Sequence, residues 1–163
     1  MAEPAERSDL LAALHPITRA LRRIEEDAAA QEGLTMWRYA ILSVVADRPG
    51  ASQREIAAHL QYSPNRLVVD LRDLERSGWV VRRPGADRRA NVLALTGPGD
   101  AVRRRVRAEI HRREDALLDG LPEERRASFE RAARELADLV RRRAAAARPP
   151  SSGTTPATPP GRG

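Results

Sequence analysis

Apolar residues recur every three or four positions through most of this chain, which predicts a fold built mainly of helices. A first long helix is expected after a cap at Ser8-Asp9, and a last one after the break at residues 120–122. Their apolar seams are Leu10, Leu14, Ile17, Leu21 and Ile24 in the first helix, and Phe129, Ala133, Leu136 and Val140 in the last. Both seams exceed the needs of a small core, so we expect a helical dimer interface. The alternative is that they pack against each other within one chain.

Three shorter helices are predicted between residues 35 and 78, each with clear boundary residues. The first runs from about Thr35 to Ala46, with Trp37, Ile41, Val44 and Val45 facing inward. A capping box, Ser52 with Glu55 three residues later, opens the second. Ser63-Pro64 opens the third, which ends at Gly78. The inward residues of these last two helices are Ile56, Ala57, Leu60, Leu67, Leu71 and Leu74.

Two short β-prone runs, residues 79–81 and 92–95, follow the third short helix and predict a hairpin. A further helix resumes after residues 96–100, with Val102, Val106 and Ile110 on one face. Two short helices joined by a tight turn and followed by a hairpin make a winged helix-turn-helix. The expected fold class is therefore mainly α with a small β-hairpin wing, flanked by long N- and C-terminal dimerisation helices.

The domain prediction places one winged-helix domain at residues 8–146. Residues 34–96 would form its DNA-reading lobe, and residues 8–30 and 98–146 the dimerisation helices. Residues 147–163 are rich in Pro, Ser, Thr and Gly, and hold no apolar residue larger than alanine. Such a segment cannot bury enough surface to offset its chain entropy, so a disordered tail is expected.

The net charge of the chain indicates what kind of molecule it binds. The 163 residues carry a formal net charge of +6, and every positive side chain apart from histidine is arginine. A GC-rich genome accounts for arginine over lysine, but a basic balance points to an acidic partner such as nucleic acid. The absence of cysteine excludes disulfides and thiol sensing. The N-terminus lacks the order of a signal peptide, so a cytoplasmic protein is expected.

The helix at residues 64–77 is the candidate reading helix of this motif. With Leu67, Leu71 and Leu74 taken as its core side, four residues point outward and Arg66 lies on the flank. The outward residues are Asn65, Val69, Arg72 and Arg76. Asparagine and arginine suit bidentate contacts with adenine and guanine edges. The alternative is an ordinary solvated face, because three arginines and three acids nearly balance along this helix.

The loop between the two strands carries an unusual excess of positive charge. It contains Arg82, Arg83, Arg88 and Arg89 with a single acid, Asp87, for a local charge of +3. We expect all four arginines to bind DNA and to supply attraction that does not depend on sequence. Arginine suits a narrow minor groove, and Asp87 could fix the loop or orient an arginine by a charge-assisted bond. The alternative is a solvent-exposed hairpin with scattered charges.

The run "GWVVRRPGADRRANVLALT", residues 78–96, resembles the signature region of MarR-type winged-helix transcription regulators. It has a Gly-aromatic-Val-x-Arg entry to the wing, an Asp-x-Arg at its tip and a Leu-Thr-x-x-Gly exit. The upstream run "ASQREIAAHLQYSPNRLVVDLRDLERSG" and the long helices on either side are also similar in spacing, so the resemblance covers about residues 8–145. Val69 and Asp70 depart from the residues that many relatives have at these positions, which affects the expected base contacts.

The resemblance implies a homodimer that binds a pseudo-palindromic operator in double-stranded DNA. It implies that Arg89 enters the minor groove and that Asp87 stabilises the wing. Ser63, Asn65, Arg66 and Val69 would fall in the recognition-helix segment, and Ser52 and Gln53 would meet backbone phosphate.

Many members of the family release DNA when a small aromatic or acidic molecule binds. His15, Trp37, Arg38 and Tyr39 are the candidate ligand residues, because aromatic rings and a cation can hold a carboxylate-bearing ring. The alternative is that both aromatic residues only pack and that His15 is an exposed helix residue. No histidines have metal-ligand spacing, and no cofactor is expected.

The function predicted from these patterns is a sequence-specific transcriptional regulator, a repressor rather than an activator. Two other classes of protein are the alternatives to this function. An enzyme is not expected, because no nucleophile-base set, phosphate loop or carboxylate pair stands out. A winged-helix interaction module without DNA reading would account for the neutral reading helix, but not for the basic wing.

Overall fold

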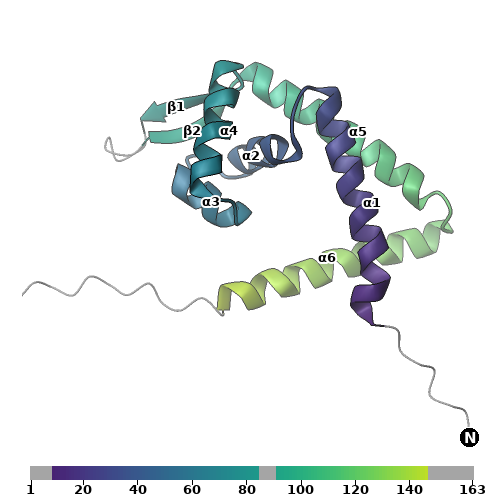
Figure 1. Ribbon diagram of the computed structural model, residues 1–163. Coiled ribbons are helices and arrows are strands. Elements are labelled where there is room, and N and C mark those ends of the chain that lie inside the picture. The colour runs from purple at the N-terminus through teal and green to yellow at the C-terminus, as the bar shows by residue number, and fades with distance from the viewer. Residues whose placement is uncertain (1–8, 85–90, 147–163) are drawn as a thin grey trace, which may run out of the picture. The chain divides into compact units, whose positions relative to one another are not determined.

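The structure, a computed structural model, describes residues 9–84 and 91–146 and is mainly helical with one β-hairpin (Figure 1). The elements are α1 (Leu10–Gln31), α2 (Met36–Asp47), α3 (Gln53–Leu60), α4 (Pro64–Arg76), β1 (Val80–Pro84), β2 (Asn91–Leu95), α5 (Gly97–Leu118) and α6 (Glu123–Ala146). The predicted winged helix-turn-helix between long helices is confirmed. Asp87, Arg88, Arg89 and the predicted tail lie outside the described residues.

The chain divides into two compact units, one ending at Leu117 and the other beginning at Leu118. The first contains the helix-turn-helix, the wing and nearly all of α5, and the second contains α6. None of the described helices is long and apolar enough to cross a bilayer. The division into a DNA-reading lobe and dimerisation helices stays a prediction.

Helix α2 lies at the centre of the first unit and contacts α1, α3, α4 and β2 (Figure 1). Its Ile41 and Leu42 are fully buried. Every position predicted to face inward on α4 is buried, as are three on α5. The core residues are Ala28, Ala29, Leu34, Ile41, Leu42, Val44, Val45, Ile56, Ala57, Leu67, Leu71, Leu74, Val80, Leu93, Val102, Val106 and Ile110.

Backbone chemistry fixes the end of α4 and the start of the wing. Gly78 has a φ of +71°, a left-handed conformation that a side chain disfavours. Its N–H donates to the Glu75 carbonyl, and the Trp79 N–H donates to the Leu74 carbonyl, both over 3.0 Å. These two bonds form a Schellman motif, which stops the helix and turns the chain into β1.

The wing is a two-stranded antiparallel hairpin whose two ends are tied together. Val80 pairs with Leu95, and Arg82 with Leu93. The Thr96 hydroxyl donates to the Gly78 carbonyl over 2.7 Å and accepts from the Gly99 N–H over 3.0 Å. An isolated bridge between Ser52 and Val92 also brings the start of α3 to β2. The wing is thus anchored to the helix-turn-helix on both sides.

One local expectation is wrong, and two helix caps are confirmed in position only. Trp37 is expected to face inward, but its side chain is 37% exposed and stacks on Tyr62 outside the buried core. Asp9 and Ser63 are the N-cap residues of α1 and α4, but neither side chain makes a capping hydrogen bond. The residue types therefore predict where these two helices begin, but not whether the cap side chains make hydrogen bonds.

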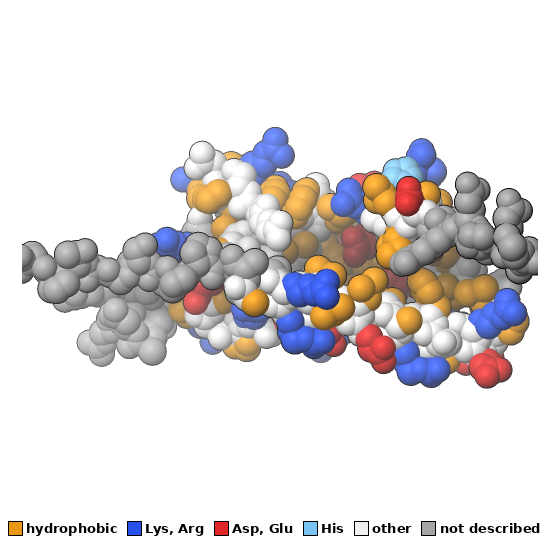
Figure 2. Space-filling view, turned by 90° about the horizontal axis from the view of Figure 1, so that it is seen from below, with side chains coloured by type: hydrophobic (Ala, Val, Ile, Leu, Met, Phe, Trp, Pro, Cys, Tyr) orange, Lys and Arg blue, Asp and Glu red, His pale blue; other side chains and the backbone are white. Residues whose placement is uncertain are grey.

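The long helices expose apolar side chains in the single chain. On the face shown in Figure 2, orange apolar side chains lie among blue arginines and red acids. Among the exposed residues, α1 contributes Leu10, Leu11 and Leu14, and α6 contributes Phe129, Leu136, Leu139 and Val140. These residues include much of the two predicted seams.

Candidate nucleic-acid interface

Helix α4 presents its polar face to solvent, as its helical spacing predicted. Leu67, Leu71 and Leu74 anchor the opposite face in the core. Val69, also on the outward face, is 57% exposed. The exposed residues of this helix and its N-cap are Ser63, Pro64, Asn65, Arg66, Val69, Arg72 and Arg76.

The three acids of α4 are engaged with arginines. Asp70 accepts from Arg38 of α2 over 3.0 Å, and its side chain is only 14% exposed. Asp73 pairs with Arg38 and, over 3.2 Å, with Arg76. Glu75 accepts from Arg82 of the wing over 2.6 Å. A helix that is nearly neutral by count therefore uses its acids mainly to bind neighbouring elements.

Two exposed arginines of α4, unlike its acids, are not used in ion pairs with other described residues. Arg66 and Arg72 make no ion pair within the described parts of the chain. Their guanidinium groups carry donors for carbonyl, ring-nitrogen or phosphate acceptors. The polar face of α4 is therefore basic, although the helix as a whole is not.

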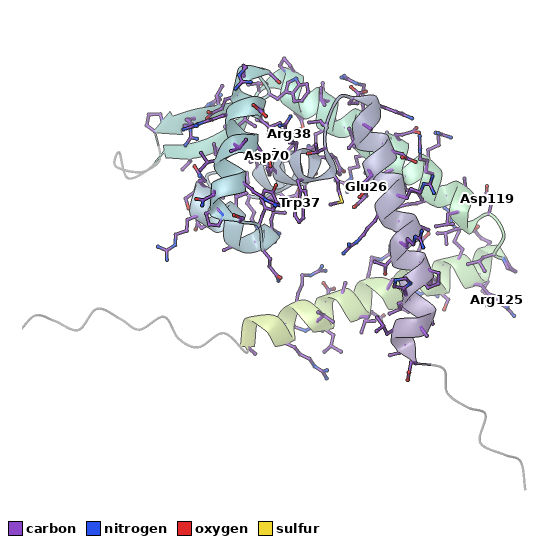
Figure 3. The ribbon with its side chains drawn as sticks, in the orientation of Figure 1. Glu26, Trp37, Arg38, Asp70, Asp119 and Arg125 are labelled. Atoms are coloured by element: carbon purple, nitrogen blue, oxygen red, sulfur yellow. The ribbon has the colours of Figure 1, made fainter. Side chains whose placement is uncertain are left out.

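Arg38 and Tyr62 join α2, α4 and the turn between α3 and α4. The Tyr62 hydroxyl donates to Asp70 over 2.8 Å, and its ring stacks on Trp37 with centroids 4.4 Å apart. Burial and the bond to Asp70 raise the pKa of the Tyr62 phenol. Figure 3 shows Trp37, Arg38 and Asp70 near one another where α2 faces α4. This cluster fixes the reading helix against the centre of the fold.

The start of α3 has the predicted capping box. The Ser52 N–H and hydroxyl both donate to the Glu55 carboxylate over 2.7 Å, and the Glu55 N–H donates back to the hydroxyl over 3.3 Å. The bonds from the Ser52 backbone and side chain lower the pKa of Glu55. The Ser52 hydroxyl is thus occupied by the cap. Gln53 accepts from Arg82 over 3.4 Å.

Two of the wing arginines lie on β1. Arg82 is directed to α4 and α3 by its bonds to Glu75 and Gln53. Arg83 is exposed and borders a groove of about 600 Å³ on the other side of the hairpin. This groove is lined by Val45, Ala46, Pro49, Gly50, Arg83, Val92, Leu93, Ala94, Leu95, Thr96, Gly97, Asp100 and Arg103.

Comparison with known proteins gives one consistent result. A model of the MarR family matches residues 32–90, which contain α2, α3, α4 and β1. The HTH-type transcriptional repressor Rv2887 of Mycobacterium tuberculosis is 28% identical over 119 residues, which are 72% of this chain and 86% of that protein. The chain belongs to the MarR family.

Other relatives and solved structures agree with this assignment. A protein of Thauera aromatica named as a transcriptional regulatory protein for the hcr operon is 30% identical over 96 residues. That match spans 58% of each of the two chains. The crystal structure of Rv2887 with DNA superposes with a TM-score of 0.70 at 27% identity, covering 80% of this chain and 98% of that one. The protein is therefore a MarR-family transcriptional regulator.

A second structure of Rv2887, in complex with salicylic acid, superposes with a TM-score of 0.67 at 27% identity. It covers 82% of this chain and 99% of that one.

The residues predicted to hold a ligand in this MarR-family chain have different surroundings. His15 is exposed on the N-terminal half of α1, and Tyr39 packs against the core. Trp37 stacks on Tyr62, and Arg38 is paired with two carboxylates. None of the four lines the groove behind the wing. Among the described residues, no group of three or more His, Asp or Glu could hold a metal ion.

The sequence reasoning missed the residues that support the reading helix. The sequence assigns Asp73 and Glu75 no role beyond neutralising the helix, treats Asp70 otherwise only as a departure from the family pattern, and gives no signal for Tyr62. The signal that could have found Asp70 and Asp73 was their spacing. Both lie next to the leucine face of α4, at positions 70 and 73 beside 71 and 74, and therefore near a packed neighbour.

Proposed function

We propose that this MarR-family regulator is a homodimeric repressor that reads a pseudo-palindromic site in double-stranded DNA. One recognition helix of each protomer, α4, would enter a major groove, and each wing would reach the adjacent minor groove. The relative Rv2887, which is named a repressor, has a structure described as a complex with DNA.

The observation that carries this proposal is the separation of charge on α4. Its acids bind arginines, two of them from outside the helix, whereas Asn65, Arg66 and Arg72 face solvent. The acids are used within the fold, so the face of α4 that is left to solvent carries the positive charge that suits a polyanion. Arg66 and Asn65 are our candidates for base contacts, Val69 for apolar contact with a thymine methyl, and Arg72 for phosphate or base.

Positive charge beside α4 would supply the sequence-independent part of the affinity. Arg83, Arg88 and Arg89 are the proposed wing contacts, with Arg89 in the minor groove and Asp87 as the residue that stabilises the loop. Ser52, Gln53 and Ser63 would lie near the phosphate backbone. The Ser63 side chain makes no capping hydrogen bond, which supports its use in this way.

The exposed apolar residues of α1 and α6 support dimerisation. Leu10 and Leu11 on α1 are 62% and 77% exposed, and Leu136 and Val140 on α6 are 48% and 57% exposed. Apolar stripes on long helices are typical of interfaces between protomers. In a dimer, the spacing of the two α4 helices would set the spacing of the half-sites.

Release of DNA by a small aromatic or acidic ligand remains part of the proposal. Rv2887 has a structure described as a complex with salicylic acid. Trp37 and Tyr39 offer aromatic surface and His15 an exposed imidazole. The Arg38 guanidinium is already shared by Asp70 and Asp73, so a ligand carboxylate would have to compete with them.

Fluorescence anisotropy would test the function directly. The duplex is the region upstream of this gene, compared with a scrambled duplex at several salt concentrations. We expect tight binding to the native duplex, a steep salt dependence from phosphate contacts, and a clear preference over the scrambled one. Equal binding to both duplexes would contradict specific reading of that site. No binding to either at low salt would favour the interaction-module alternative.

Two variants would assign the interface, with a third as control. Arg66→Ala and Arg89→Ala should each weaken binding by about 1–3 kcal/mol, the scale of one good contact. Arg66→Ala should also reduce the preference for the native duplex, since it removes a base contact. Arg107→Ala removes an exposed arginine of α5 and should leave affinity unchanged. Unchanged affinity in a folded Arg89→Ala variant would contradict the wing assignment.

A further inference from the structure

Arg82 is the one wing arginine with contacts to both helices of the helix-turn-helix, within the described part of the wing. Its Nε donates to Glu75 Oε1 over 2.6 Å, and its Nη1 donates to Gln53 Oε1 over a longer 3.4 Å. The side chains of Arg82 and Glu75 are 38% and 28% exposed. One guanidinium therefore joins β1 to the last turn of α4 and the first turn of α3.

The neighbouring Arg83 provides an internal comparison. Successive side chains of a strand point to opposite faces, so Arg83 faces away from α4 toward the groove behind the hairpin. It makes no ion pair with any described residue. Two adjacent arginines of equal charge on one strand thus have different environments, and their environments predict different roles.

An arginine that is already paired with a carboxylate is poorly suited to add a phosphate contact. Its charge is balanced by the bond to Glu75 in the free protein, so a phosphate contact by Arg82 would add less electrostatic attraction than a contact by an unpaired arginine. Retaining that bond, in contrast, fixes the direction of the hairpin relative to α4. A two-stranded hairpin has little rigidity of its own, and a small misplacement of a contact weakens recognition.

We infer that Arg82 is a positioning residue, which holds the wing at the angle to α4 that DNA binding requires and does not itself contact DNA. This inference rests on the proposed function, in which α4 and the wing bind one duplex. Glu75 is then part of the same device, and Gln53 extends it to α3. The arginines that contact phosphate are those without an internal partner.

The first test compares salt dependence in Arg82→Ala and Arg83→Ala. Each phosphate contact contributes about 0.9 to the slope of log K against log salt. We expect Arg83→Ala to lower the slope by about that amount. Arg82→Ala should leave the slope unchanged while raising Kd by about fivefold or more, the lower range of coupling between contacting residues. A slope reduced equally in both variants would overturn the inference.

Glu75→Gln gives the sharpest contrast, because the two roles of Arg82 predict opposite signs. If Arg82 contacts phosphate, removal of a nearby negative charge frees it and strengthens DNA binding. If Arg82 positions the wing, loss of the ion pair weakens binding despite the more favourable net charge. We expect weaker binding. The exchanged pair Glu75→Arg with Arg82→Glu should restore affinity above that of either single variant, and failure to do so in a folded protein counts against positioning.

Amide hydrogen exchange of the free protein tests the same inference without DNA. Arg82→Ala and Glu75→Gln should both speed exchange in β1 and β2, and Arg83→Ala should not. Equal exchange in all three variants would overturn the positioning role. If the wild-type protein binds no duplex, the proposed function fails, whereas the exchange measurement still decides whether Arg82 holds the wing.

Discussion

Replacing Arg38 by methionine tests whether the reading helix depends on its ion pairs with α2. The change keeps an unbranched side chain but leaves Asp70 without the guanidinium that now donates to it. Hydrogen bonds to charged groups contribute about 1.5–3 kcal/mol when buried, and exposed ion pairs about 0–1 kcal/mol. Arg38 is 27% exposed and Asp70 14% exposed, which is nearer the buried case. With Asp73 as a second partner, we expect a loss of about 2–3 kcal/mol.

Arg76→Ala is the matched control, because Arg76 pairs with the same Asp73 but is 78% exposed. Its loss should cost less than about 0.5 kcal/mol. Urea unfolding, followed by circular dichroism at one protein concentration, measures both variants, since the concentration affects the apparent stability of a dimer. If Arg38→Met and Arg76→Ala lower the free energy of unfolding equally, the α2–α4 ion pairs do not stabilise the reading helix.

Three further predictions concern the wing junction, the long helix α5 and the cap of α3. A Cβ at Gly99 would lie 2.0 Å from the Trp79 carbonyl oxygen, so Gly99→Ala should cost at least about 1–3 kcal/mol in urea unfolding. Gly97→Ala meets no atom within 4 Å and should cost little. Bonds from Arg112 and Arg113 lower the pKa of Glu109 from 4.5 to about 2, so its stabilising contribution is complete above pH 4.5 and is lost as the pH falls toward 2. In the Glu109→Gln variant, the urea concentration at the unfolding midpoint should therefore decrease less between pH 5 and pH 3 than it does in the wild type. An equal decrease in both proteins would refute this. Ser52→Ala should cost about 1 kcal/mol from loss of the cap, and a loss of DNA affinity without loss of stability would instead indicate a phosphate contact.

The order and bounds of the helices and strands can be predicted from short-range patterns in the sequence. Leu67, Leu71 and Leu74 recur at helical spacing, and all three are buried. Ser52 with Glu55 forms the capping box that the spacing predicted. Gly78 ends α4 because its positive φ closes a Schellman motif there. Each of these features depends on residues within a few positions of one another, so no knowledge of tertiary structure is required.

The contacts that orient the reading helix could not be predicted in the same way. Arg38 lies 32 residues from Asp70, and their pairing depends on how α2 crosses α4. The pairing of Arg82 with Glu75 depends on the direction of the hairpin after Gly78. Trp37 is expected in the core with Ile41, Val44 and Val45 of the same helix, yet it is exposed and stacks on Tyr62. Helical spacing gives the face of a residue but not its partner.

The net charge of α4 does not indicate the charge of its exposed face, for the same reason. The acids and arginines nearly cancel in sequence, which favoured a helix without a DNA ligand. In the structure, Asp70 and Glu75 are held by arginines of α2 and β1, whereas Arg66 and Arg72 face solvent. The acids therefore serve two purposes at once. They attach the reading helix to the elements on both sides of it, and they leave its exposed face with the charge that a polyanion requires.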